Sequence, residues 1–439
     1  MSGFEIALIG VAVLLALLVL RVPVGVAMLA VGMGGYWVLA GLGPLLNMSK
    51  TAVYWRFANY DLAVVPMFLL MSQFASRAGL SRELFTSANA FLGHFRGGVA
   101  MATIAGCAGF GAICGSSLAT AATMSQVALP ELKRYKYAGS LATATLAAGG
   151  TLGILIPPSV VLVIYAIAVE ANITTLFQAA FVPGVLAALG YMLTIAVYVR
   201  VWPDSGPMGR RASGADMLRA FLRTWPVSLI FALVIGGIYF GVFTPSEGAA
   251  VGAFGTGVIA FWRGGLRLKG YLESIAAAGI FTAMIFLIVL GAEFFNSFLA
   301  LSRMPAEMAE RIGGSGLPAL AVLIVIVLIY VVLGCVMDTL AMILLTVPIF
   351  WPIIAGLDFG MPVDDARIWF GIIALVVVEV GLITPPVGLN VFIINSMAPD
   401  VPMKETFKGV LPFLLSDLVR IILLIAFPIL TLGLPALLK

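Results

Sequence analysis

Apolar stretches follow one another along almost the whole chain, and only short polar segments separate them. A helix needs about 20 apolar residues to cross a bilayer, and lipid tolerates only helices or closed barrels. Runs of this length therefore predict transmembrane helices, so we expect an all-α polytopic membrane protein. The runs cover residues 4–20, 23–42, 61–76, 97–114, 154–169, 178–199, 226–243, 275–300, 316–337, 370–383 and 409–435.

Composition agrees with this pattern. Apolar residues make up 62% of the chain and charged residues 10%, and the mean hydropathy is +1.14, whereas soluble domains are about half apolar and a quarter charged. The longest polar stretch, about 201–225, leaves no room for a sizeable soluble domain. The net charge of +4 belongs to the loops and suits an anionic lipid face, so we expect the lipid bilayer and no nucleic acid as a partner.

The chain has few residues of the kinds that form metal or catalytic sites. The three cysteines lie in apolar surroundings and are interpreted as small buried hydrophobes. One histidine, His94, and scattered cysteines exclude a zinc site of the usual kinds. The start, Met-Ser-Gly-Phe-Glu, lacks the basic segment of a signal peptide, so the run 4–20 is expected to be retained.

An internal repeat organises the chain. The segment 153–158 (Gly-Ile-Leu-Ile-Pro-Pro) recurs at 381–386 as Gly-Leu-Ile-Thr-Pro-Pro, and Leu-Ser-Arg at 80–82 recurs at 301–303. Each Pro-Pro interrupts an apolar run. Paired broken segments at matching places in two halves of a membrane protein mark a transporter's binding site, although one Pro-Pro alone could be a simple kink.

Charge predicts how the two copies are oriented. The turn after the first copy's Gly-Ser-Ser segment, 131–136, is basic, and the matching turn, 358–367, is acidic. Because lysine and arginine concentrate in cytoplasmic loops, the two turns are expected on opposite sides, which defines an inverted-topology repeat. The linker 203–214, which includes the basic residue Arg210, precedes a short basic amphipathic helix. The apolar face of this helix holds Met217, Leu218, Phe221, Leu222 and Trp225.

Short segments beside these turns predict two re-entrant hairpins. Residues 117–130 pair with 138–150, and residues 339–353 pair with 368–380. The tips are expected at 114–117 and 337–339, each facing the broken segment of its own copy. The domains then run as 1–60 (N-terminal scaffold helices), 61–200 (repeat one), 201–225 (cytoplasmic linker), 226–274 (scaffold helices) and 275–439 (repeat two).

The tips and breaks offer ligands for a cation. A broken helix frees carbonyl oxygens and N–H groups, which suit Na⁺ and a carboxylate respectively. Hydroxyls stand at the same places: Ser116, Ser117, Thr120, Thr339 and Thr384. No tip or break contains lysine or arginine, so an anionic substrate is expected to be held by amides, hydroxyls and the bound cation.

Structural interpretations remain open for several of these residues. The two serines could serve close helix packing, and Asp338 could cap a helix, although a buried acid at a tip favours a site role. Glu293 and Glu379 could be structural partners of backbone groups. His94, in the loop signature 93–98, is interpreted as part of an interfacial turn.

Seven stretches in order along the chain resemble the large membrane subunit of the tripartite ATP-independent periplasmic (TRAP) transporters. They are 66–68 (PMF), 93–98 (GHFRGG), 115–119 (GSSLA), 150–159 (GTLGILIPPS), 183–184 (PG), 243–247 (FTPSE) and 379–390 (EVGLITPPVGLN). The resemblance implies an elevator-type importer, in which a transport domain moves against a scaffold. It also implies sodium-driven uptake of an organic acid, a periplasmic substrate-binding protein, a small four-helix membrane subunit and a place in the bacterial inner membrane.

The resemblance also carries over site residues. Sodium is expected at Ser116, Ser117, Gly153, Ile156, Pro158, Asp338, Thr339, Gly381, Thr384 and Val387. Substrate is expected at Ser116, Ser117, Pro157, Ser159, Asp338, Pro385, Pro386 and Asn390. Two departures from the family pattern are Cys114, where a serine is expected, and Trp369, where a histidine is common.

The sequence therefore predicts a sodium-coupled importer of a C4-dicarboxylate or similar carboxylate, with Na⁺ as coupling ion and no organic cofactor. The absence of a P-loop argues against ATP hydrolysis by this chain. The alternative is a self-sufficient sodium/dicarboxylate symporter that needs no binding protein. A membrane enzyme would need a cluster of histidine, acidic or cysteine residues at one membrane face, and a channel would fit inverted broken helices less well.

Overall fold

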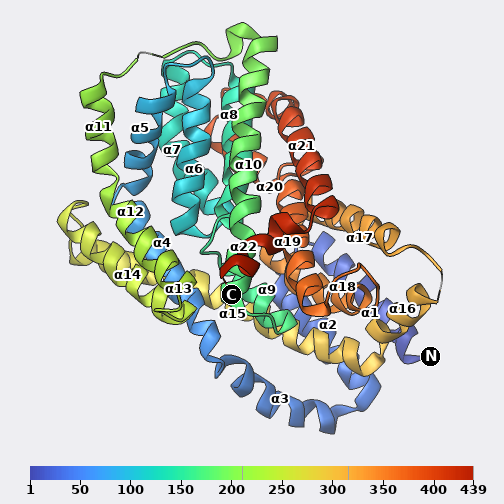
Figure 1. The fold of residues 1–439 in the computed structure, drawn as a ribbon. Helices are drawn as coiled ribbons and strands as arrows, with labels where there is room; N and C mark the ends of the chain where they lie inside the picture. Colours follow the sequence, from blue (N-terminus) through green and yellow to red (C-terminus); the bar gives the residue numbers. More distant parts are fainter. Residues whose placement is uncertain (210, 315, 439) are drawn as a thin grey trace.

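The computed structural model describes residues 1–209, 211–314 and 316–438. Throughout these ranges the chain forms helices joined by short loops (Figure 1). The prediction of an all-α chain is therefore confirmed. The predicted linker residue Arg210 lies outside the described ranges.

Three helices are long and apolar enough to cross a membrane by themselves: α10 (Ile173–Val201), α15 (Leu268–Ser302) and α21 (Met403–Ala426). Counting three bent helix pairs as one span each would raise the number in the described chain to six, by length and composition. Other predicted runs are shorter helices or cross a break. The run 154–169, for example, contains the end of one helix, a break of four residues and then a second helix.

The longest helix, α15, is about 50 Å long at 1.5 Å per residue. It packs along α2 (Val24–Ala40) through glycines. A Cβ atom at Gly291 would lie 2.3 Å from the carbonyl oxygen of Gly25, and one at Gly32 would lie 2.5 Å from the backbone of Phe294. Small residues therefore let these two backbones touch, as is common between membrane helices.

Two parts of the chain repeat one order of elements: a short helix, a hairpin of two helices, a helix that stops at a Pro-Pro break, a short helix and a long helix. The first part comprises α5 (Leu80–Leu92), α6 (Gly98–Cys114), α7 (Ser117–Arg134), α8 (Gly139–Leu155), α9 (Val160–Val169) and α10. The second comprises α16 (Met304–Gly313), α17 (Ala319–Gly334), α18 (Thr339–Ala355), α19 (Val363–Gly381), α20 (Leu389–Met397) and α21.

The two helices that form each hairpin, its legs, are not the ones that the sequence predicted. The tip at 114–117 joins α6 to α7, and the tip at 337–339 joins α17 to α18. The predicted pairs 117–130 with 138–150 and 339–353 with 368–380 fall on α7 with α8 and on α18 with α19. The prediction of the legs was wrong because the chain reverses at the tip itself, where Gly115 has φ +63 and Ser116 caps the next helix. Helix α7 also continues through Pro130, so the basic residues Lys133 and Arg134 lie in its last turn.

The remaining helices surround these repeats. They are α1 (Gly3–Val19), α3 (Leu42–Phe57), η1 (Tyr60–Ala63), α4 (Val64–Arg77), η2 (Pro203–Ser205), α11 (Gly214–Arg223), α12 (Trp225–Phe231), the π-helix η3 (Ala232–Gly236), α13 (Gly237–Tyr239), α14 (Pro245–Trp262) and α22 (Ile429–Leu438). The run 4–20 thus forms the helix α1. All three cysteines are buried and free, as expected.

The predicted amphipathic helix is α11, and none of its residues is buried. Leu218, Phe221 and Leu222 are each more than half exposed. Trp225 belongs to the following helix instead, because the chain bends by 45° between α11 and α12–α13. The apolar face of α11 is therefore open for a surface outside this chain.

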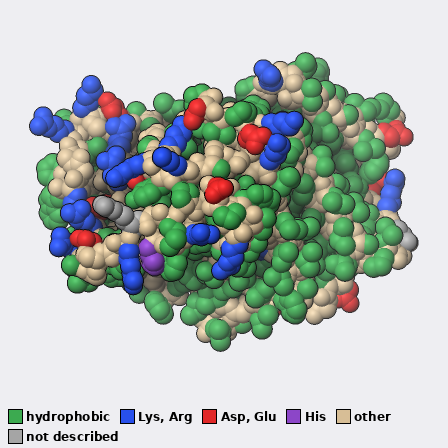
Figure 2. All heavy atoms as spheres, turned by 90° about the horizontal axis from the view of Figure 1, so that it is seen from above, with side chains coloured by type: hydrophobic (Ala, Val, Ile, Leu, Met, Phe, Trp, Pro, Cys, Tyr) green, Lys and Arg blue, Asp and Glu red, His purple; other side chains and the backbone are tan. Residues whose placement is uncertain are grey.

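One end of the molecule is basic. The turn 93–97, the linker 203–209 and the turn 135–138 meet there through backbone hydrogen bonds from Gly97 to Gly206, from Gly209 to Gly93 and from Ala138 to Ser205. Figure 2 shows lysine and arginine side chains gathered on one side of this face, near the single histidine. His94 lies in the turn between α5 and α6, as the loop signature predicted.

Candidate ion and substrate site

The first hairpin tip packs directly on the first broken helix. A Cβ atom at Gly111 would lie 2.7 Å from the Cα atom of Gly153, and one at Gly115 would lie 3.0 Å from the carbonyl oxygen of Pro158. Ser116 is the N-cap of α7, and its hydroxyl accepts a hydrogen bond of 3.4 Å from the N–H of Ala119. Only glycine permits such close backbone contact, so tip and break form one unit.

Oxygen atoms converge where these segments meet. A Cβ atom at Gly153 would lie 2.5 Å from the hydroxyl of Thr120 and 2.7 Å from the carbonyl oxygen of Ser116. The Thr120 hydroxyl is fully buried and has no hydrogen-bond partner. The Cys114 thiol interacts with it, but sulfur is a weak partner for a hydroxyl.

A buried hydroxyl without a partner is costly, and a hydroxyl beside a carbonyl is a donor set that suits a hard cation. The residues present therefore fit Na⁺ at this position. Thr120, Ser116 and Gly153 would hold the ion, which would supply the positive charge that the first tip itself lacks.

The second half repeats this packing. A Cβ atom at Gly381 would lie 2.5 Å from the Cα atom of Gly334. The N–H of Gly388 donates to the carbonyl oxygen of Cys335 over 3.2 Å. The Cys335 thiol donates to the carbonyl oxygen of Pro385 over 3.3 Å. The second tip is thus bound to the second break by backbone groups on both sides of Pro385.

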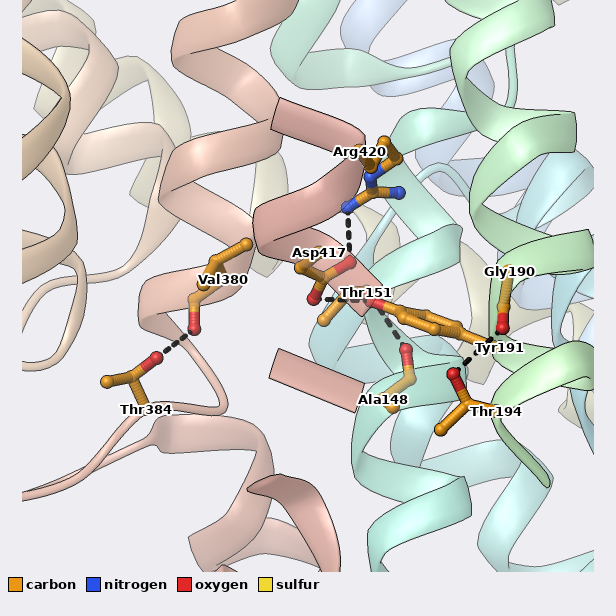
Figure 3. A network of polar contacts seen from close by, with 9 residues as sticks. All are labelled: Ala148, Thr151, Gly190, Tyr191, Thr194, Val380, Thr384, Asp417 and Arg420. Carbon is orange, nitrogen blue, oxygen red and sulfur yellow. Dashed lines mark hydrogen bonds and ion pairs between the residues drawn. The ribbon is translucent and has the colours of Figure 1, made fainter. Parts of the chain in front are cut away.

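The predicted oxygen ligands of the second half have partners within the protein. Asp338 is the N-cap of α18 and accepts from the N–H of Leu340 over 3.0 Å, so the capping interpretation holds for this carboxylate. The Thr384 hydroxyl donates to the carbonyl oxygen of Val380 over 2.6 Å (Figure 3). A hydroxyl that donates one hydrogen bond keeps its lone pairs as acceptors, so Thr384 can still face a cation.

The two breaks differ in exposure. Residues 154–159 are all buried, whereas Pro385 and Pro386 are exposed and Val387 is half-buried. Both prolyl bonds, Pro157–Pro158 and Pro385–Pro386, are cis. The first half-site is therefore closed within the protein, and the second opens to its surface.

Glu379 joins the two halves. It lies in α19, two residues before Gly381, and is completely buried. One carboxylate oxygen accepts a short hydrogen bond from the hydroxyl of Ser117 in the first tip. The other accepts from the hydroxyl of Thr339 in the second tip over 2.8 Å. The sequence pattern left Glu379 as a structural partner of a backbone group, but its partners are hydroxyls at both tips.

Asn390 also crosses between the halves. Its amide donates to the carbonyl oxygen of Ala147 in α8 over 3.2 Å, and its own carbonyl oxygen is buried without a partner. A Cβ atom at Gly150 would lie 3.1 Å from the Asn390 amide nitrogen and 3.2 Å from the carbonyl oxygen of Ser117. The start of α20 thus meets α8 here, beside Ser117 of the first tip, with one unpaired acceptor.

Not all predicted residues join this centre. Ser159 is the N-cap of α9 and accepts from the N–H of Leu162 over 3.4 Å. Ile156 is the C-cap of α8, and a Cβ atom at Gly184 would lie 2.9 Å from its side chain, so Ile156 packs against α10. Pro157 is buried beside it. The structure therefore brings together Ser116, Ser117, Gly153 and Pro158 in the first half, joins Thr339 and Asn390 to them, and keeps Asp338, Gly381 and Thr384 in the second half.

A buried charged network was missed. Arg420 and Asp417 lie in α21, within the predicted apolar run 409–435. The Arg420 guanidinium nitrogen Nη2 is 2.8 Å from Asp417 Oδ1, and both side chains are at least 95% buried. The Tyr191 hydroxyl donates to Asp417 Oδ2 over 2.9 Å and lies 3.1 Å from the Thr151 hydroxyl (Figure 3).

This network binds α10 and α21 to α8 two residues before Gly153. Opposite charges three positions apart within an apolar run were the signal that could have revealed it, since such residues inside a membrane segment are rarely without a role.

Glu293 is explained similarly, since its carboxylate pairs with Arg56 of α3. Of the two departures from the family pattern, Cys114 accepts from the Ser72 hydroxyl over 3.0 Å. The Trp369 indole donates to the carbonyl oxygen of Leu424 over 2.9 Å.

Comparisons with known proteins agree with this architecture. The family model "Tripartite ATP-independent periplasmic transporter, DctM component" matches residues 11–430. The chain is 36% identical over 378 residues to the C4-dicarboxylate TRAP transporter large permease protein DctM of Pseudomonas aeruginosa, covering 86% of each chain. It is 30% identical over 402 residues to the isethionate TRAP transporter permease protein DctMQ of Oleidesulfovibrio alaskensis, covering 90% of this chain and 61% of that relative.

A solved structure has the same fold. The YdaH transporter of Alcanivorax borkumensis superposes with a TM-score of 0.63 at 15% identity, covering 88% of this chain and 89% of that one. The fold class predicted from the sequence, a helical transporter with broken helices, is therefore confirmed.

Proposed function

Because the chain belongs to the family of the DctM component of TRAP transporters, we propose that it is the large permease of a sodium-driven importer of small organic acids. Members of this family are subunits of transporters, so the chain is a multi-pass membrane permease and not an enzyme. The proposal adds the coupling ion, the class of substrate and the partners.

The observation that carries the choice of sodium is the buried oxygen cluster at the first tip. The unpartnered Thr120 hydroxyl, the Ser116 carbonyl and the close approach at Gly153 form a small site of hard, uncharged oxygens.

The substrate is proposed to bear a carboxylate or sulfonate group. The two relatives above are named for C4-dicarboxylates and for isethionate, which are both small organic anions. Of the two breaks only the second is exposed, at Pro385 and Pro386, so the anionic group is proposed to approach there. The N–H groups at the start of α20 and the bound cation would hold the anionic end, because the start of α18 is already capped by the Asp338 carboxylate.

An inverted repeat is supported by charge at the two ends. Exposed cations surround the turn 135–138, and the equivalent loop of the second copy, 356–362, leads into the acidic residues Asp364 and Asp365. The basic end would face the cytoplasm. The two copies would then have opposite orientations, as an alternating-access mechanism needs.

Two partners are proposed. The relative DctMQ is longer than this chain, which covers 61% of it, and its additional length supports a second membrane component, proposed as a small membrane subunit. The family description includes a periplasmic, tripartite arrangement, which supports a soluble binding protein as the third component. The chain is then expected in the inner membrane of a bacterium.

Reconstitution tests the proposal. Liposomes would contain this chain with its small membrane partner, and uptake of a labelled C4-dicarboxylate would be measured after adding the loaded binding protein. An inward sodium gradient should drive uptake, and an equal potassium gradient should not. Sodium-driven uptake by the chain alone would instead favour the self-sufficient symporter, and uptake without any sodium dependence would contradict the proposed coupling.

A further inference from the structure

Among the residues that the structure describes, Glu379 is the one carboxylate that accepts hydrogen bonds from both hairpin tips. Its two oxygens accept hydrogen bonds from Ser117 and from Thr339, which belong to different copies of the repeat and are 222 residues apart. Glu379 is completely buried, and Ser117 and Thr339 are at most 3% exposed. Water therefore does not replace either hydrogen bond.

A carboxylate is planar and rigid, so its two oxygens cannot turn independently. Any rotation that improves the bond to one hydroxyl changes the bond to the other, and a hydrogen bond to a charged group is stronger than one between neutral groups. Ordering one tip therefore orders the carboxylate, and the carboxylate in turn orders the other tip. Two sites that share an ordered element are thermodynamically coupled, and the coupling is reciprocal.

We infer that Glu379 is a positioning residue that couples the two tips, so that each cation half-site is completed only when the other is also ordered. It acts through the hydroxyls of Ser117 and Thr339 and needs no contact with the ion or the substrate. The inference rests on the proposed function for its link to sodium. The mechanical coupling of the tips does not depend on which ion is used.

The decisive variant is Glu379→Gln in the complete transporter, reconstituted with both partners. The amide removes the charge, keeps one acceptor oxygen and places an N–H₂ donor opposite the other hydroxyl. The sodium concentration at half-maximal uptake should rise about tenfold, which corresponds to weakening one charge-assisted hydrogen bond. The Hill coefficient for sodium should fall towards one, because the hydrogen bonds of a neutral amide couple the two half-sites more weakly than those of a carboxylate.

The matched control is Thr346→Val. Thr346 is also buried in α18, and its hydroxyl contacts Tyr330 over 2.9 Å and the carbonyl oxygen of Met342 over 2.7 Å, without touching Glu379. It should leave the Hill coefficient and the half-saturating sodium concentration unchanged. If Glu379 had a merely structural role, Glu379→Gln would lower the amount of folded protein, but the folded fraction would have the same Hill coefficient and half-saturating sodium concentration as Thr346→Val.

A double-mutant cycle covers the case in which Glu379→Gln does not fold. Ser117→Ala and Thr339→Val each remove one hydroxyl from an intact carboxylate. Either change alone should lower the Hill coefficient, and the second should add little, because the link is already broken. Independent, multiplicative effects of the two changes would overturn the inference, as would an unchanged Hill coefficient in Glu379→Gln.

Thermal unfolding in sodium-free buffer separates this inference from the proposed function. The shifts in melting temperature caused by Ser117→Ala and Thr339→Val should be non-additive, whereas each should add to the shift of Thr346→Val. This result would support coupling of the tips even if uptake proved independent of sodium. Additive shifts for all three pairs would overturn the inference while leaving sodium-driven uptake intact.

Discussion

Replacing Thr120 by valine should leave the sodium-free protein at least as stable as the natural chain and should reduce the stabilisation that sodium adds. Its hydroxyl is fully buried without a hydrogen-bond partner, and burying such a group costs about 1–3 kcal/mol. Valine keeps the shape and removes this cost. In sodium-free buffer, the variant should therefore be as stable as the natural chain or more stable, by at most about 1–3 kcal/mol.

Sodium should stabilise the variant less. A ligand present at 100 times its dissociation constant adds about 2.7 kcal/mol to the free energy of unfolding. If the loss of one oxygen weakens binding tenfold, the same concentration adds only about 1.4 kcal/mol. The assay is the melting temperature of the purified chain with its membrane partner, followed over a sodium titration with choline replacing sodium. The increment on adding sodium should be about half that of the natural chain.

Thr145→Val is the matched control for this experiment. Thr145 lies in α8, is fully buried, and its hydroxyl also has no hydrogen-bond partner. It should show the same gain in sodium-free buffer and the full increment with sodium. The reasoning would be refuted if Thr120→Val kept the full sodium increment, because its hydroxyl would then be an unpaired group and not a ligand.

Three further predictions follow from the same geometry. Thr384→Ala removes a hydroxyl beside the second break and should raise the half-saturating sodium concentration for uptake about tenfold with the protein still inserted; unchanged sodium dependence would exclude this ligand. Cysteines at Lys133 and Asp364 should react with an impermeant reagent from opposite sides of the membrane, and labelling of both from one side in intact cells would contradict the inverted repeat. Arg420→Met should lower the free energy of unfolding by about 3–5 kcal/mol, because it leaves the Asp417 charge buried and unpaired. Thermal unfolding of the double variant Arg420→Met with Asp417→Leu should show most of this loss recovered. No recovery would argue against the ion pair as the cause.

The hairpins show where sequence reasoning reached its limit. The tips at 114–117 and 337–339 could be located because glycine and helix-capping residues mark a chain reversal locally. The legs were assigned to the wrong helices because segment length and hydropathy were used in place of helix ends. Helix α7, for example, runs through Pro130, since the contacts of a packed helix outweigh one missing hydrogen bond.

By itself, the sequence determined the membrane class, the repeat, the place of both breaks and the family. These properties follow from apolar runs and from local motifs such as Gly-Ser-Ser and Pro-Pro, which can be read within a few residues. The tertiary structure alone decided which polar groups meet. Ser117 and Glu379 are 262 residues apart in the chain, and Tyr191 and Asp417 are 226 apart.

Packing also decided what each group does once it is there. The sequence already named Thr120 among the candidate hydroxyls, but only packing showed that its hydroxyl has no partner. Glu379 became a link because one buried carboxylate lies between two tips. Asp338, the more prominent acid in the sequence, became a helix cap. The free energy of a buried polar group depends on its neighbours in space, and for Glu379 these neighbours are 262 and 40 residues away in the chain.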